Sequence, residues 1–174
     1  MTTSRLELVP ATLTLIEAEL NSNSRLASAL GAHVPDDWPP GEYDRPAIEY
    51  FRAKLSANPE HVGWYGWYAI LRPTDSEPAT LVGAGGYFGP PVSNDVVEIG
   101  YSVVHSFKGR GYATELVRAL VEYAFATGRV KRIVAHTTPE NIGSVKVLEK
   151  SGFRFVGSGK DPGTVEYECG HQAG

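Results

Sequence analysis

The sequence predicts a domain of the α+β or mixed α/β class, built of at most three layers of secondary structure. Three strand-like runs follow one another between residues 63 and 104 with only short polar turns between them, which favours an antiparallel meander. The pattern then changes to a helical period over residues 113–125 and alternates between strand and helix towards the C-terminus. The length of 174 residues suits one domain, and we expect residues 1–174 to form it.

The N-terminal part is predicted to contain one strand and two helical regions. Pro10 ends the strand, because proline has no N–H group to donate to a ladder. Residues 21–24 interrupt the helical spacing that follows, and Gly31 suits the left-handed position past a helix end. In chain order we expect a strand over 5–9, a helical region over 11–30, an aromatic-containing loop over 34–45 and a helix over 46–55.

The C-terminal part is predicted to be a sheet interrupted by two helices. Residues 113–125 place apolar side chains on one face, and Glu115 and Arg118 on the other, as an amphipathic helix does. Gly152 suits the end of the second helix. In chain order we expect strands over 63–71, 80–88 and 96–104, a helix over 113–125, a strand over 133–137, a helix over 141–151, and a hairpin of 153–157 with 164–169.

Charge and cysteine content argue against several classes of protein. The net charge is −4 with scattered Lys and Arg, whereas a nucleic-acid-binding domain usually presents a basic face. Cys169 is the single cysteine, so neither an intramolecular disulfide nor a Cys-rich zinc site is expected, and the five histidines form no metal-binding pattern. No signal peptide or membrane span is predicted, so we expect a cytoplasmic protein without a membrane partner.

The clearest chemical signal is the loop over residues 106–114, which joins a predicted strand to the long helix. Gly109 and Gly111 permit positive φ and a close approach of a ligand to the main chain. The first N–H groups of a helix have no intrahelical partner and lie at the positive end of its dipole. Such a junction is an anion site, most naturally for phosphate, and Lys108 and Arg110 add positive charge.

Three ligands and a purely structural turn compete as explanations of this loop. A nucleoside triphosphate loop requires Gly-x-x-x-x-Gly-Lys-Ser/Thr, and no such run occurs. A dinucleotide fingerprint requires a glycine three positions after Gly111, where Thr114 stands. The diphosphate of coenzyme A needs only backbone N–H groups, and a tight turn without any ligand needs only the glycines.

Three motifs, in order, resemble the GNAT superfamily of N-acetyltransferases. Residues 108–113 (KGRGYA) resemble its acetyl-CoA signature, Arg/Gln-x-x-Gly-x-Gly/Ala, with lysine in the first position. Residues 97–103 (VEIGYSV) resemble the family's fourth strand, and residues 138–153 resemble its second cofactor motif. The combination of Glu-Ile-Gly-Tyr with Pro-Glu-Asn and a following serine is similar to the RimJ/RimL branch, which includes protein N-terminal acetyltransferases.

The resemblance implies a central mixed, mostly antiparallel sheet of six to seven strands with helices on both faces. Two parallel strands, which end near Val104 and Thr137, would splay apart and form the acetyl-CoA cleft. Pantetheine would pair with the exposed strand edge, and a bulge would aim the Val103 N–H at the thioester carbonyl. The residues then predicted to contact the cofactor are Ser102, Val103, Val104, Lys108, Gly109, Arg110, Gly111, Tyr112, Ala113, Thr114 and Asn141.

Glu98 and Ser144 are the predicted catalytic residues. An amine must lose its proton before it attacks, and Glu98 is a carboxylate inside a predicted strand that could accept it directly or through water. A sheet-bridging or solvated glutamate is the alternative. In many members of the family a tyrosine acts as the general acid at the position where this sequence has Leu148. Ser144 is the nearest replacement as a hydrogen-bond donor to the sulfur. The alternative is that Ser144 caps a helix.

The predicted function is acetyl transfer from acetyl-CoA to an amine through a tetrahedral intermediate. The resemblance implies a protein N-terminus, a peptide or a small-molecule amine as the acceptor, with a homodimer as one possible assembly. The alternative is a catalytically silent acyl-CoA-binding or sensory module on the same fold.

Overall fold

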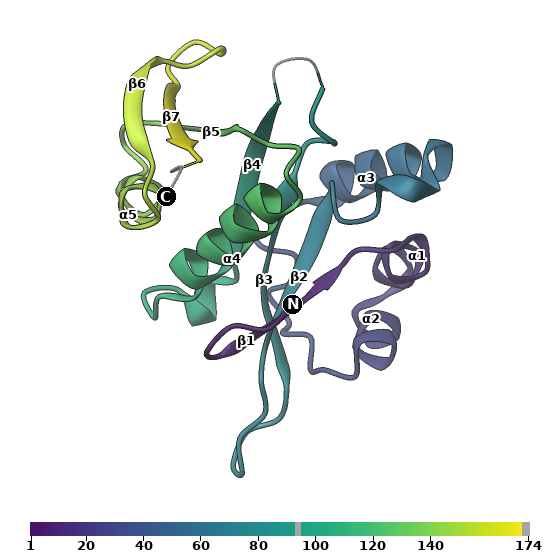
Figure 1. Cartoon of the computed structure of the whole chain (residues 1–174). Coiled ribbons are helices and arrows are strands. Elements are labelled where there is room, and N and C mark those ends of the chain that lie inside the picture. Colours follow the sequence, from purple (N-terminus) through teal and green to yellow (C-terminus); the bar gives the residue numbers. More distant parts are fainter. Residues whose placement is uncertain (93–94, 172–174) are drawn as a thin grey trace.

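The computed structural model describes residues 1–92 and 95–171. Within these residues, seven strands form one sheet in the order β1-β2-β3-β4-β5-β7-β6, which confirms the predicted fold class (Figure 1). The strands are β1 Leu6–Pro10, β2 Gly66–Leu71, β3 Thr80–Tyr87, β4 Val96–Val103, β5 Arg132–Thr137, β6 Arg154–Ser158 and β7 Val165–Gly170. The helices are α1 Leu13–Asn21, α2 Asn23–Leu30, α3 Arg45–Ala57, α4 Tyr112–Ala126 and α5 Ile142–Lys150, with short 3₁₀ turns η1 Pro59–His61 and η2 His105–Phe107.

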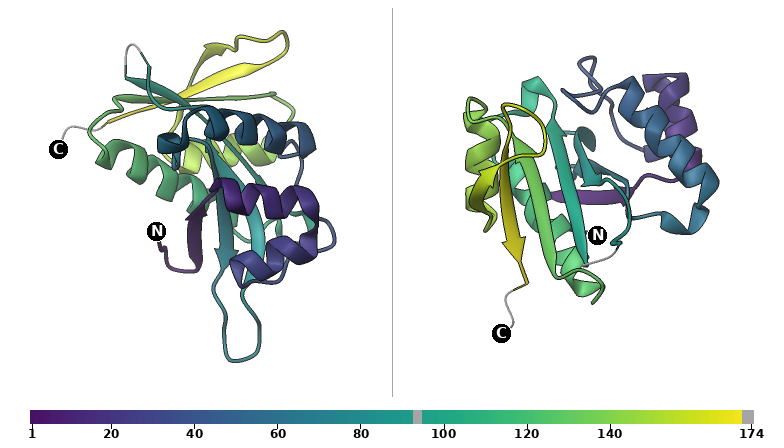
Figure 2. Two further views of the ribbon diagram at one scale, coloured as in Figure 1. Left: turned by 90° about the vertical axis from the view of Figure 1, so that its right-hand side faces the viewer. Right: turned by 90° about the horizontal axis from the view of Figure 1, so that it is seen from above.

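The sheet separates two hydrophobic cores because successive strand residues point to opposite faces. Leu81 packs with α1, α2 and α3, whereas its neighbour Val82 packs with α4 and α5. Figures 1 and 2 show this layering, with α1–α3 on one face of the sheet and α4 and α5 on the other. None of the helices in the described part of the chain combines the length and apolar character that a membrane-spanning segment requires.

The predicted interruption of the first helical region is confirmed at Ser22. This residue has extended φ and ψ, ends α1, and accepts a hydrogen bond from the Arg25 N–H at 3.1 Å, so it also caps α2. Gly31 ends α2 in the left-handed conformation with φ of 65°. The chain therefore turns twice within ten residues and folds α1 and α2 against each other.

All strand pairs in the described sheet are antiparallel except β4 with β5. The predicted hairpin of β6 and β7 forms, but it is β7, the second strand of the hairpin, that pairs with β5. Sequence order alone does not indicate this insertion, since either strand of a hairpin can join a neighbour.

A buried carboxylate ties the N-terminal helices to the sheet. Glu19 on α1 is 8% exposed and accepts hydrogen bonds from Trp38 Nε1 at 2.9 Å, Tyr43 OH at 2.9 Å and Tyr68 OH at 2.6 Å. Burial raises the pKa of Glu19, and the three donors partly oppose that rise. The aromatic residues of the loop before α3 are therefore core residues, and the loop is held in place from within.

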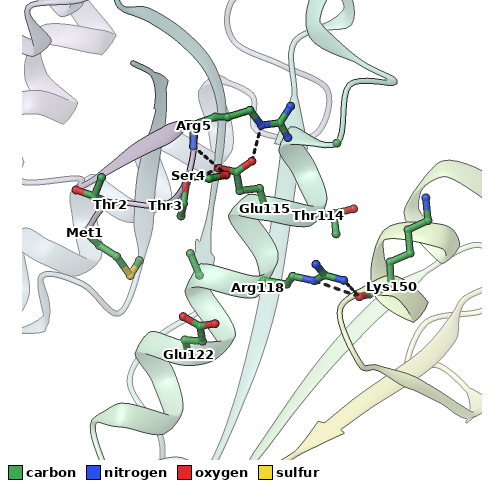
Figure 3. Close-up of a pocket in the computed structure, with 12 residues that line it drawn as sticks. Met1, Thr2, Thr3, Ser4, Arg5, Thr114, Glu115, Arg118, Glu122 and Lys150 are labelled. Atoms are coloured by element: carbon green, nitrogen blue, oxygen red, sulfur yellow. Dashed lines mark hydrogen bonds and ion pairs between the residues drawn. The ribbon is translucent and has the colours of Figure 1, made fainter. Parts of the chain in front are cut away.

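The N-terminal segment is fastened to the start of α4 through Glu115. Its carboxylate accepts hydrogen bonds from the hydroxyls of Thr3 and Ser4, from the Arg5 N–H at 2.7 Å and from Arg5 Nε at 2.7 Å (Figure 3). Partial burial alone would raise the pKa of Glu115, but these donors and the guanidinium charge outweigh burial and lower that pKa to about 2.

Because the folded-state pKa of Glu115 lies below its unfolded value, its stabilisation is complete above pH about 4.5 and is lost as the pH falls towards 2. We therefore expect Glu115→Gln to lower the melting temperature by about 3 °C at pH 7, the effect of losing roughly 1 kcal/mol. The difference from wild type should shrink between pH 4.5 and 2 in thermal melts followed by circular dichroism. Glu122→Gln, at an exposed position of the same helix, is the control. A pH-independent difference would contradict this assignment.

Candidate functional site

Strands β4 and β5 pair over a short distance and then separate. The parallel register runs through Val96↔Arg132, Val97↔Ile133 and Glu98↔Val134, whereas β4 continues to Val103 and β5 to Thr137. The predicted splay of the two strands is therefore confirmed, and it begins directly after Glu98.

The free edge of β4 can be assigned from its hydrogen bonds to β3. The Phe88 N–H donates to the Glu98 carbonyl at 3.2 Å, and the Val104 N–H donates to the Val82 carbonyl at 3.0 Å. Even-numbered residues of β4 thus direct their backbone groups towards β3, and Tyr101 and Val103 direct theirs into the gap. The register with β3 is one-to-one from Ile99 to Val103, so the bulge predicted in β4 is wrong for this stretch, and simple alternation orients the Val103 N–H.

A cavity of about 670 Å³ occupies the gap. Its walls come from β4, β5, the glycine loop with the first turn of α4, and α5, together with Glu42, Phe88 and the turn between β6 and β7. The residues predicted from the sequence that line it are Glu98, Ser102, Val103, Lys108, Gly109, Gly111, Tyr112, Ala113, Thr114, Asn141 and Ser144.

Val104 and Arg110 are the two predicted site residues that lie outside this lining. Val104 is fully buried, and its N–H is used by β3. The Arg110 side chain bends back to the Ser106 carbonyl at 3.3 Å and stacks over Phe107. Val104 faces away from the gap because backbone groups alternate in direction along β4. Arg110 lies between two glycines with positive φ, which turn the loop at this point.

The glycine loop has the backbone geometry of an anion cradle. Gly109 and Gly111 have φ of 76° and 84°, and Gly111 immediately precedes α4, whose first turn begins without a side-chain cap. The first N–H groups of the helix are therefore available to an anion at the cavity wall formed by Gly111–Thr114. This arrangement fits the diphosphate of coenzyme A, and the open edge of β4 fits the amide groups of pantetheine.

The charges of the cavity differ between its two parts. Lys108 on the glycine loop and Lys146 and Lys150 on α5 make the wall around the helix start basic. Glu42, Glu98 and Asp161 are the acidic residues of the lining, and Lys160, next to Asp161, lines it as well. A bound anion is thus favoured at the glycine loop, and a cation can pair with the carboxylates elsewhere in the cavity.

Glu98 bridges the two strands at the point where they separate. Its carboxylate lies 2.9 Å from His136 Nδ1 on β5 and 2.6 Å from Lys160 Nζ, and the other ring nitrogen of His136 lies 3.0 Å from Glu166 Oε2. The ring can donate to both carboxylates only as an imidazolium. The sheet-bridging alternative therefore describes the position of Glu98, and the same carboxylate also lines the cavity.

A pair of hydroxyls lies on the α5 side of the gap. Tyr101 OH is 2.9 Å from Ser144 Oγ, and burial raises the pKa of Tyr101 to about 12. Asn141 Oδ1 accepts from the Ser144 N–H at 3.1 Å, so Asn141, and not Ser144, caps α5. Leu148, at the position of the missing tyrosine, is 1% exposed and belongs to the core.

Sequence comparison decides the family. The model of the acetyltransferase (GNAT) domain matches residues 5–154. The chain belongs to the GNAT acetyltransferase family. Membership in this family identifies it as an acetyl-CoA-dependent N-acetyltransferase, as predicted. The match is to the superfamily, and the narrower RimJ/RimL resemblance stays a prediction.

Individual relatives agree with this assignment. The GNAT chain is 31% identical to the uncharacterized N-acetyltransferase YjdG of Bacillus subtilis over 151 residues, which cover 87% of each protein. It has the fold of aminoglycoside acetyltransferase AAC(6')-Ib in complex with coenzyme A and kanamycin (22% identity, TM-score 0.61, 96% and 95% of the two chains covered). It also has the fold of ribosomal-protein-S5-alanine acetyltransferase from Vibrio fischeri (16% identity, TM-score 0.67, 99% and 97% covered).

Several residues in or beside the GNAT cleft were missed by reasoning from the sequence. Lys160 and Glu166 reach Glu98 and His136 from the C-terminal hairpin, and Glu42 arrives from the loop before α3. No motif marks these positions. Tyr101 could have been predicted, because it lies on the strand that was expected to pair with the cofactor.

Replacing Gly111 tests the anion cradle. A valine there must adopt φ near 84°, which L side chains rarely do, and its Cβ would lie 3.2 Å from Arg5 Nη2, so either the loop backbone or the Arg5 side chain has to shift. We expect Gly111→Val to weaken coenzyme A binding at least about tenfold in calorimetry, since a hydrogen bond to a charged group contributes roughly 1.5–3 kcal/mol.

Gly128→Val is the matched control. Gly128 has φ of 70° just after α4, with nothing within 4 Å of an added Cβ, so the backbone strain is similar and the cleft is untouched. Unchanged affinity in a folded Gly111→Val protein would contradict the placement of the diphosphate.

Proposed function

We propose that this GNAT enzyme acetylates a primary amine of a small cationic molecule. The carboxylates of the cleft carry the proposal. Lys108 lies at the start of α4, where the diphosphate of acetyl-CoA would bind, and Glu42, Glu98 and Asp161 line the cleft together with Lys160. An acceptor that enters as an ammonium ion is attracted to these carboxylates and can be held next to Glu98.

Glu98 is proposed as the base that receives the proton of the acceptor, directly or through water. Acetyl-CoA supplies an activated thioester carbonyl and a thiolate that can leave. The Glu98 carboxylate contacts His136 Nδ1 and Lys160 Nζ, and an entering ammonium can take the place of the exposed Lys160 amine.

The backbone and the hydroxyl pair are proposed to act on the two ends of the reacting thioester. The N–H groups of Tyr101 and Val103 point into the gap, where they would stabilise negative charge on the carbonyl oxygen. Ser144 and Tyr101 are proposed to donate a hydrogen bond to the sulfur. Since a thiolate with a pKa of about 8.5 leaves readily, their contribution is expected to be smaller than that of the N–H groups.

The acceptor class can be tested by following thiol release from acetyl-CoA with a panel of amines. We expect turnover with diamines and with an aminoglycoside such as kanamycin, and little with peptides that begin with alanine or serine. Turnover with peptides alone would overturn the small-molecule proposal. Tight coenzyme A binding without turnover on any acceptor would instead support a catalytically silent module.

The role of Glu98 can be tested by Glu98→Gln. We expect kcat to fall at least about a hundredfold, the usual contribution of a general base, while coenzyme A affinity stays within about twofold. Glu149→Gln, which changes an exposed carboxylate on α5, should retain wild-type kcat. An unchanged kcat in Glu98→Gln would refute the role.

A further inference from the structure

We infer that Arg5, at the N-terminus, is a positioning residue for the cofactor loop. It fixes the peptide between Arg110 and Gly111 so that the Gly111 N–H faces the cleft. The inference rests on the proposed binding of the coenzyme A diphosphate at this loop. It concerns a residue that lies outside the lining of the cleft and 105 positions before the loop.

Arg5 makes three separate contacts around the start of α4. Its Nη1 donates to the Arg110 carbonyl at 2.8 Å, and its Nε donates to Glu115 Oε2 at 2.7 Å. The guanidinium also lies over the Tyr112 ring, 4.5 Å from the centroid. Figure 3 shows the side chain extending from the N-terminal segment across the first turn of α4. The planar guanidinium with its fixed donor directions is suited to joining these groups at once.

The contact with the Arg110 carbonyl determines where the next N–H points. Among the described residues the one cis peptide bond is Trp38–Pro39, so the 110–111 peptide is trans. In a planar trans peptide the carbonyl and the N–H point in opposite directions. Because the carbonyl faces Arg5, the Gly111 N–H is directed away from it.

Gly111 lies between two cavities, so the direction of its N–H decides which of them the N–H faces. On one side is the cleft, and on the other is a cavity of about 540 Å³ bounded by the N-terminal residues, α4 and Lys150. Arg5 lines only the second cavity, and Gly111 lines both. The carbonyl held by Arg5 is therefore on the rear side of the loop, and the N–H is on the cleft side.

The loop needs such a tether because of its own sequence. Gly109 and Gly111 both have positive φ, and glycine populates several backbone regions at little cost. The peptide between Arg110 and Gly111 can rotate more easily because Gly111 is free at φ, and a rotated peptide would present its carbonyl to the cleft, where it would repel a phosphate. The Arg5 backbone N–H and Arg5 Nε both donate to the Glu115 carboxylate. Arg5 is therefore held by α4 while it holds the loop.

The test compares Arg5→Gln, Arg5→Lys and the control Arg25→Gln, which removes the same charge from an exposed position on α2. The Kd of free coenzyme A is measured by calorimetry on proteins whose fold is verified by circular dichroism. We expect the Kd to rise about tenfold in both Arg5 variants, because lysine keeps the charge but not the two-directional geometry, and to stay unchanged in Arg25→Gln.

Amide hydrogen exchange of the coenzyme-free protein supplies a second readout. Residues 106–114 should exchange faster in both Arg5 variants than in wild type. If Arg5→Lys binds coenzyme A as wild type does, Arg5 acts through charge and the positioning role is refuted. If wild-type protein itself binds no coenzyme A, the proposed function fails instead, so the two failures are distinguishable.

Discussion

The early end of pairing between β4 and β5 is the constraint on which the site depends. After Glu98 the N–H and carbonyl groups along one edge of β4 have no neighbouring strand. Buried backbone groups require partners, and a ligand with amide groups of its own can supply them. The bridge from Glu98 to His136 marks where the protein's own pairing stops.

The two parts of the cleft are built in different ways. The cofactor part comes from one stretch of chain, with β4, the glycine loop, α4 and α5 following one another. The proposed acceptor part is assembled from distant loops, and the loop that brings Glu42 also places Gly41 against Ser102, where an added Cβ would lie 2.6 Å from Oγ. Glu19 holds this loop from the core through Trp38 and Tyr43. The two parts of the cleft are therefore supported by different segments of the chain.

This division explains what could be predicted from the sequence. The strand, the glycines and the long helix are local patterns, so the fold class could be predicted from them. The family resemblance supplied the residues expected to contact the cofactor, and most of these line the cavity. Val104 is among the predicted cofactor contacts because the sequence does not show which edge of β4 pairs with β3 and which edge is free. Lys160 and Glu166 depend on the register of the C-terminal hairpin and on the insertion of β7 beside β5, which are properties of the assembled sheet.

The insertion of β7 has a consequence for synthesis on the ribosome. β5 pairs with β4 through three residues and with β7 through six, so the outer arm of the gap depends mainly on β7. A nascent chain that has released α5 already contains the glycine loop, but its β5 is supported only by the short pairing with β4. Acetyl-CoA can stabilise only the completed arrangement, and we expect truncation before residue 165 to yield a chain that chaperones retain.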